Sequence, residues 1–234
     1  MAKIDPGKTL EIVRRAVTEP VQKAPDVRGL YEEIANSSTA AFGLGLAVCG
    51  TVAIVTKAEA TGDQITVVSC LVFGLSTIAV YLFSTLYHAF QVQPFKHWFR
   101  VLDHQSIYLI IAGSYTPYLL ITLRNDSGWT VCWMIWGLAA VGLLYKLFFF
   151  GRSEVVSVLS YVCMGYMIFF VREPMLELMP REGLLWLAAC GVSYTTGVYF
   201  YWKDHKAFYH TIWHFFVLGG SICHYISVYC YVLT

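Results

Sequence analysis

The chain has 234 residues, of which 57% are hydrophobic and 13% charged, and its mean hydropathy is +0.58. An ordinary soluble domain carries about 25% charged residues, so this composition excludes that class and indicates an integral membrane protein. The net charge of +1, with no basic stripe outside the apolar segments, argues against a nucleic-acid partner.

Residues 1–33 are polar and have no apolar core of the signal-peptide type. We expect them to form a cytoplasmic tail ahead of a transmembrane domain at 34–234. Within this tail, residues 9–21 could form a short amphipathic helix on the membrane surface or remain disordered.

Seven apolar segments follow the tail, each near the ~20 residues that a helix needs to cross ~30 Å of hydrocarbon. They are 34–56, 64–90, 99–123, 128–150, 154–172, 183–202 and 208–232. The sequence therefore predicts an all-α bundle of seven transmembrane helices, multi-pass in the plasma (inner) membrane. The seven cysteines all lie in these segments and are interpreted as packing residues.

The distribution of Lys and Arg predicts the orientation. The tail and the second, fourth and sixth loops with their helix ends carry twelve of the sixteen basic residues. Because cytoplasmic loops are enriched in positive charge, we expect the N-terminus inside and the C-terminus outside.

Two features predict how single helices pack. The first segment has small residues four apart, a spacing that lets helix backbones approach closely in lipid. They are Ala35, Thr39, Gly43, Ala47 and Thr51. In the third segment, Pro117 removes a backbone donor and should kink the helix.

Two histidines stand one helical turn apart in the last segment. His210 and His214 project from one face, because four residues make nearly a full turn and about 6 Å of rise. This spacing lets one helix offer two nitrogens to one metal, as in the zinc motif HExxH. Polar side chains inside a membrane span are costly and usually functional.

A catalytic zinc site needs a third protein ligand and an open position. His88 ends the second segment, with Ser84 one turn before it on the same face, and Asp103 begins the third segment. Alternating helix directions place these residues in the same layer as His210 and His214, near the cytoplasmic surface. Asp103 would hold and deprotonate a water that zinc activates, while the alternative is an ion pair with Arg100.

The other histidines have simpler interpretations. His97 and His205 lie in loops, and His104 points away from Asp103 and is interpreted as an interface residue. His224 lies deep in the last segment, about 80° from the face of His210 and His214. We interpret it as a core histidine with satisfied hydrogen bonds.

Several blocks of this sequence resemble the hemolysin III family, the bacterial relatives of the progestin and adiponectin receptors. The blocks are "YEEIANSSTAAFG", Ser84-x3-His88, "LDHQSIYLIIAGSYTPYLL", "GRSEVVSVLSYVCMGY" and "HTIWHFFVLGGSICH". The opening block departs from the family in having Ala40 where a histidine is usual.

The resemblance implies seven helices with the N-terminus inside, Zn2+ held by His88, His210 and His214, and a water near Asp103 with Ser84 close by. For the receptor branch of the family it implies hydrolysis of lipid amides, and for the bacterial branch an enzyme, membrane-lipid homeostasis or haemolytic activity. We therefore expect a hydrolase of lipid-like amides or esters, with membrane lipid as the partner and source of substrate. The alternative is a non-enzymatic pore former, sensor or membrane-homeostasis factor with a structural zinc. A fourth protein ligand that closes the site would favour that alternative.

Overall fold

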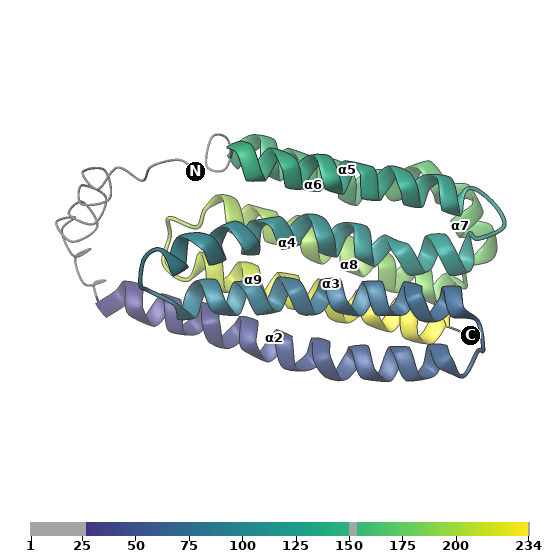
Figure 1. The fold of residues 1–234 in the computed structure, drawn as a ribbon, viewed down its shortest axis with the longest axis horizontal. Coiled ribbons are helices and arrows are strands. Elements are labelled where there is room, and N and C mark those ends of the chain that lie inside the picture. The colour runs from purple at the N-terminus through teal and green to yellow at the C-terminus, as the bar shows by residue number, and fades with distance from the viewer. Residues whose placement is uncertain (1–26, 150–153, 234) are drawn as a thin grey trace, which may run out of the picture. The chain divides into compact units, whose positions relative to one another are not determined.

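The computed structural model describes residues 27–149 and 154–233, and every regular element in these ranges is a helix. The amphipathic helix expected at residues 9–21 lies outside the described residues. Residues 32–234 form one compact unit, and residues 27–31 are the first residues of its first helix. Figure 1 labels the helices along the chain. They are α2 (Val27–Glu59), α3 (Gln64–Ala89), α4 (Phe95–Pro117), η1 (Tyr118–Thr122), α5 (Gly128–Phe149), α6 (Glu154–Gly165), η2 (Tyr166–Val171), α7 (Arg172–Leu178), α8 (Arg181–Trp202), α9 (Tyr209–Ser227) and η3 (Val228–Val232).

Six helical stretches in the described residues are long and apolar enough to cross a membrane. They start at Gly29, Gln64, Gly128, Val155, Arg181 and Tyr209. The third predicted span, α4 with η1, is not among the six. Its first turns carry Lys96, His97, Arg100 and Asp103, which lower its mean hydropathy.

Two helices run beyond their predicted spans. The helix expected at 34–56 begins at Val27 and ends at Glu59, so it extends into the polar segment. The stretch expected to end at residue 172 continues through η2 and α7 to Leu178. In both cases polar or charged residues continue a helix past its apolar part, which hydropathy alone does not detect.

The small residues of α2 pack against neighbouring helices, as the spacing predicts. A Cβ added at Gly43 would collide with the ring of Tyr81, and one added at Gly74 on α3 would collide with the side chain of Thr51. Thr39 contacts His214 on α9. The stripe therefore brings α2 against both α3 and α9, which carry the histidines.

Pro117 ends the regular part of α4, and a π-helical turn, η1, follows it. The N–H of Tyr118 bonds to the carbonyl of Tyr115 instead of that of Ser114. The Nε2–H of His224 donates to this Ser114 carbonyl at 3.2 Å, and Nδ1 lies 3.3 Å from Cys190 Sγ. His224 is thus a buried histidine with both nitrogens satisfied, as expected.

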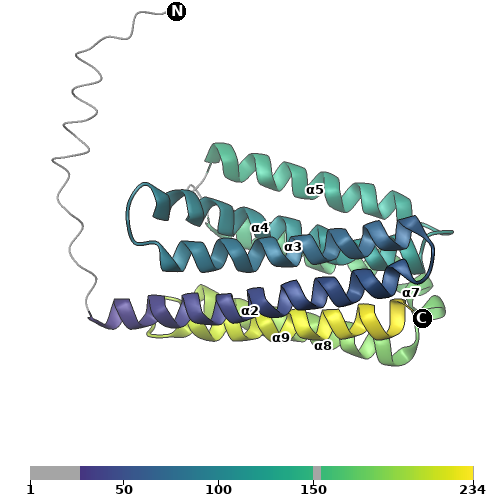
Figure 2. The same cartoon turned by 60° about the horizontal axis from the view of Figure 1, so that its bottom comes forward.

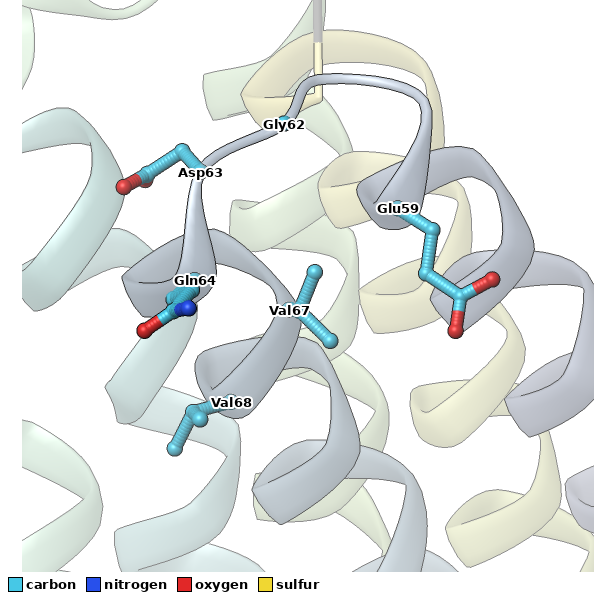
Figure 3. A pocket seen from close by; sticks show the side chains of 6 residues that line it. All are labelled: Glu59, Gly62, Asp63, Gln64, Val67 and Val68. Atoms are coloured by element: carbon cyan, nitrogen blue, oxygen red, sulfur yellow. The ribbon is translucent and has the colours of Figure 1, made fainter.

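The α2–α3 turn lies at the end of α3 opposite to His88 (Figures 1 and 2). Asp63 caps α3 by accepting from the Thr66 N–H at 3.1 Å, and it forms an ion pair with Arg124. An open pocket at this turn is lined by Glu59, Gly62, Asp63, Gln64, Val67 and Val68 (Figure 3). Twenty-odd residues of helix separate it from His88, about 35 Å, so it plays no part in the histidine site.

Candidate metal centre

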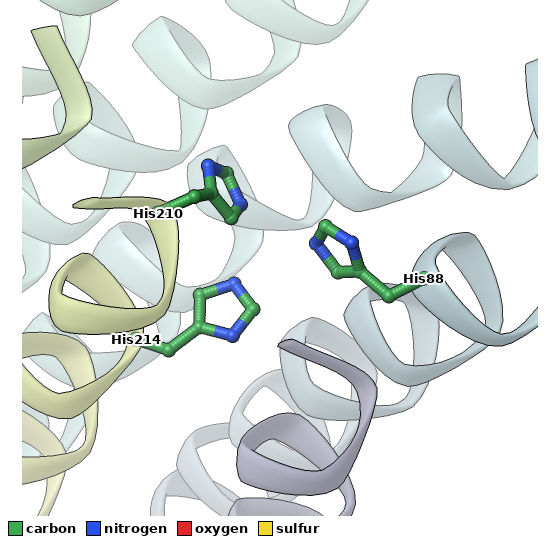
Figure 4. A group of neighbouring side chains, drawn as sticks. All are labelled: His88, His210 and His214. Carbon is green, nitrogen blue, oxygen red and sulfur yellow. The ribbon is translucent and has the colours of Figure 1, made fainter. Parts of the chain in front are cut away.

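Three histidines from two helices meet at one end of the bundle. Their ring centroids lie 5.0 Å (His88 to His210), 5.2 Å (His88 to His214) and 4.8 Å (His210 to His214) apart. One nitrogen from each ring lies within 4.8 Å of the other two. Figure 4 shows the three rings converging on a common space between α3 and α9. These residues could hold a metal ion, and among the described residues they are the one such group.

A carboxylate fixes the ring of His88. Its Nδ1 lies 2.7 Å from Glu33 Oε2, so Nδ1–H donates to the carboxylate and Nε2 keeps its lone pair. Nε2 is buried and has no hydrogen-bond partner within the described part of the chain. A buried nitrogen left unpaired is costly, and a metal ion would supply the missing partner.

Main-chain and side-chain oxygens fix the ring of His214. Its Nδ1 lies 3.2 Å from the carbonyl oxygen of Asn36 and 3.1 Å from Thr39 Oγ1. A carbonyl only accepts hydrogen bonds, so Nδ1 carries the proton and Nε2 has the lone pair that could bind a metal. Thr39 donates its own hydroxyl proton back to α2 carbonyls and can accept from the ring.

His210 is placed by the turn that enters α9. Phe208 adopts φ +58°, a left-handed conformation that is uncommon for a bulky residue, and α9 begins at Tyr209. His210 is therefore in the first turn of its helix, and His214 lies one turn deeper. A zinc ion bonds histidine nitrogen at about 2.0–2.1 Å, so an ion shared by the three rings would draw them closer together.

Asp103 and Ser84 form a second polar pair beside the histidines. The Ser84 hydroxyl and the charge of Arg100 both interact with the Asp103 carboxylate. Ser84 is buried and lies one turn, about 6 Å, before His88 on α3. The pair thus joins α4 to α3 within a turn of His88.

The structure corrects one interpretation and adds three residues. His104, expected at the interface, is buried, and its Nδ1–H donates to the Arg100 carbonyl at 2.8 Å. Glu33, Asn36 and Thr39 orient the histidine rings but were not predicted as part of the site. They recur every third residue on α2, a helical spacing that places polar groups along a single face.

Comparisons with known proteins give a consistent result. A model of the family described as Haemolysin-III related matches residues 29–225, which include every residue of this site. Hemolysin-3 of Bacillus cereus is 41% identical over 202 residues, 86% of this chain and 92% of that protein. The Hemolysin-3 homolog of Bacillus subtilis (strain 168) is 36% identical over 202 residues, 86% of this chain and 95% of that protein.

A more distant relative is found in animals. The human Monocyte to macrophage differentiation factor is 29% identical over 208 residues, 86% of this chain and 85% of that protein. No solved structure matches the chain significantly.

Proposed function

Because the chain belongs to the haemolysin-III related family and is a multi-pass membrane protein, we propose that it is a zinc-dependent hydrolase of lipid-like amides or esters. His88, His210 and His214 are the zinc ligands in this proposal. Asp103 is the general base, and Ser84 is the hydroxyl that assists it.

The observation that carries the proposal is the unpaired, buried Nε2 of His88, which faces the rings of two further histidines. Three protein ligands, with no fourth found among the described residues, fit a catalytic zinc, since structural zinc sites are closed by four. An all-imidazole set suits zinc better than calcium or magnesium, which prefer oxygen.

The remaining residues supply the acid–base chemistry. A zinc ion, when bound, acts as a Lewis acid that polarises a carbonyl and activates water at neutral pH. Asp103 accepts the proton of the attacking water and returns it to the leaving group. Ser84 donates its one hydroxyl proton to the Asp103 carboxylate and so orients the base.

The topology in this proposal has seven crossings, with α4 and η1 as the third. This segment is long enough to cross the hydrocarbon, and its polar first turns would lie at the cytoplasmic surface. The excess of basic residues then places the N-terminus inside and the histidine site within about two turns of the inner surface of the plasma membrane. Substrate would enter laterally from the bilayer.

The names of the relatives favour a second candidate. Hemolysin-3, at 41% identity, is named for lysis rather than for hydrolysis. In that case the same zinc would join α3 to α9 as a structural staple, and turnover would be absent.

A hydrolysis screen separates the two candidates. Purified protein is assayed by mass spectrometry on lipid amides and esters, with and without a chelator, beside the Asp103→Asn variant. Release of fatty acid that the chelator and the substitution both abolish is the expected result. Zinc bound at one per chain with no turnover on any substrate would favour the staple.

A further inference from the structure

We propose that Glu33 is a positioning residue of the metal centre, which holds His88 in the ligating tautomer and increases the electron density on its Nε2. This inference rests on the proposed function, because it assigns a role to a residue that touches a zinc ligand. Lys96 contributes to this positioning, since it binds the same carboxylate.

The geometry divides the Glu33 carboxylate between two partners. Oε2 accepts from His88 Nδ1–H at 2.7 Å, and Oε1 accepts from Lys96 Nζ at 2.7 Å. These contacts join the start of α2 to the end of α3 and the start of α4. The His88 side chain is 4% exposed and the Glu33 side chain 26% exposed, so the hydrogen bond between them is shielded from water.

The carboxylate does two things that a neutral acceptor does less well. It fixes the proton on Nδ1, so that the lone pair of Nε2 points to His210 and His214. Its negative charge also strengthens the hydrogen bond that Nδ1–H donates, and it makes the opposite nitrogen, Nε2, a better ligand, as in carboxylate–histidine–zinc triads. His214 by contrast has only a carbonyl and a hydroxyl at its Nδ1.

Lys96 holds the Glu33 carboxylate in place. Its ammonium group contacts Oε1 and lies 4.5 Å from the centre of the Tyr87 ring, next to His88 in sequence. The cation therefore binds the carboxylate oxygen that His88 does not use.

The competing explanation is that Glu33 and Lys96 only tie three helices together. The two explanations differ in what they predict for zinc affinity relative to fold stability. A tie between helices would change the melting temperature of the metal-free protein and leave the affinity of the folded site unchanged.

The test is the zinc dissociation constant of the full chain in detergent, measured by competition with a chromogenic chelator. Melting temperatures of the metal-free proteins are recorded in parallel. The variants are Glu33→Ala and Glu33→Gln, with Glu177→Gln as the matched control, because Glu177 is an exposed carboxylate on α7. Residues that hydrogen-bond to zinc ligands typically contribute about 10–100-fold to zinc affinity.

We expect Glu33→Ala to weaken zinc binding by about 10–100-fold. Glu33→Gln, which keeps an acceptor for His88 but not the charge, should lose about tenfold in zinc affinity, whether or not loss of the Lys96 ion pair lowers its melting temperature. Glu177→Gln should bind like the unaltered protein. Affinity within twofold of the unaltered protein in either Glu33 variant would overturn the inference, and Glu33→Gln decides alone if Glu33→Ala does not fold. Failure of the unaltered protein to bind zinc would instead overturn the proposed function itself, and the inference with it.

Discussion

Nδ1 of His214 lies 3.2 Å from the carbonyl oxygen of Asn36, three residues before the Thr39 hydroxyl that contacts the same nitrogen. One turn of α2 thus determines the tautomer of a histidine on α9, 175 residues further along the chain. The helix that contributes no histidine to the cluster orients rings on both of the helices that do.

The Thr39 hydroxyl should therefore contribute to zinc affinity. Thr39→Val keeps the shape of the side chain but removes the oxygen, so one of the two acceptors at His214 Nδ1 is lost. We expect zinc to bind up to about tenfold more weakly, while Thr39→Ser, which keeps the hydroxyl, binds as before. Chelator competition measures both constants. Equal affinity in the valine and serine variants would show that the Asn36 carbonyl suffices.

Loss of any one of the three histidines should remove the metal. Elemental analysis of the purified His88→Ala, His210→Ala and His214→Ala variants should find far less than one zinc per chain, since two ligands hold zinc poorly. The matched control is His224→Ala, another buried histidine of α9, whose nitrogens serve Ser114 and Cys190. That variant should keep zinc but melt at a lower temperature, because it leaves buried polar groups unpaired. Full zinc content in His214→Ala would refute the ligand set.

The histidine cluster could be predicted from the sequence because it rests on local spacing and on helix direction. His210 and His214 share a face at any point of a helix, and alternation of helix direction places the end of α3 in the same layer as the start of α9. The order of apolar segments likewise predicts an all-helical membrane protein. None of these inferences needs side-chain detail.

The residues around the histidine cluster could not be predicted from the sequence, for a physical reason. Glu33 lies where the polar tail passes into α2, so hydropathy assigned it to the tail, and only packing of α2 against α3 brings its carboxylate to His88. The role of the Asn36 carbonyl is equally invisible, because every residue has one. The burial of His104 depends on the packing of α4 against α3 and α5, which a helical projection of one segment cannot show.

Asp103 and Ser84 should affect turnover without affecting metal content. Asp103→Asn removes the base, and general-base catalysis is worth about 10²–10⁴-fold, so kcat should fall by that factor at unchanged zinc content. Ser84→Ala leaves the carboxylate in place and should cost less. Turnover is compared at saturating substrate, with zinc measured on the same samples. If Asp103→Asn loses its zinc, the residue acts on the metal rather than on the water.

The ion pair of Asp63 and Arg124 should make stability depend on pH at the opposite end of the bundle. The hydrogen bond from Arg124, with that from Thr66, holds the pKa of Asp63 well below its ordinary value of 3.8. Because the pKa of Asp63 is lower in the folded than in the unfolded protein, its ionised carboxylate stabilises the fold fully at pH values above the unfolded pKa. This stabilisation is lost as the pH falls through the folded pKa.

The Asp63→Asn variant measures that contribution. The difference in melting temperature between it and the unaltered protein should be constant from about pH 7 to 5 and shrink below about pH 4. Asp126→Asn is the control, because Asp126 is exposed in the neighbouring loop. A difference that does not change with pH would mean that the carboxylate charge is not what stabilises this turn.

The close packing of α2 against α3 should be the part of the fold around the site that tolerates larger side chains least. A methyl group at Gly43 would overlap the ring of Tyr81, whose hydroxyl is held by Ser221 at 2.9 Å and cannot turn away freely. Overpacking of this kind costs about 1–3 kcal/mol. Gly43→Ala should therefore lower the melting temperature, whereas Gly45→Ala, which meets nothing within 4 Å, should be neutral or raise it by the better helix propensity of alanine.

Gly43→Ala should also affect the candidate metal centre. Tyr81 lies seven residues, two turns or about 10 Å, before His88 on one face of α3. A helix pushed outward at Tyr81 moves His88 away from Glu33, which belongs to α2. We expect zinc affinity to fall in Gly43→Ala and to stay unchanged in Gly45→Ala, measured by chelator competition on folded protein. Unchanged affinity in a destabilised Gly43→Ala would show that the two ends of this helix pair adjust independently.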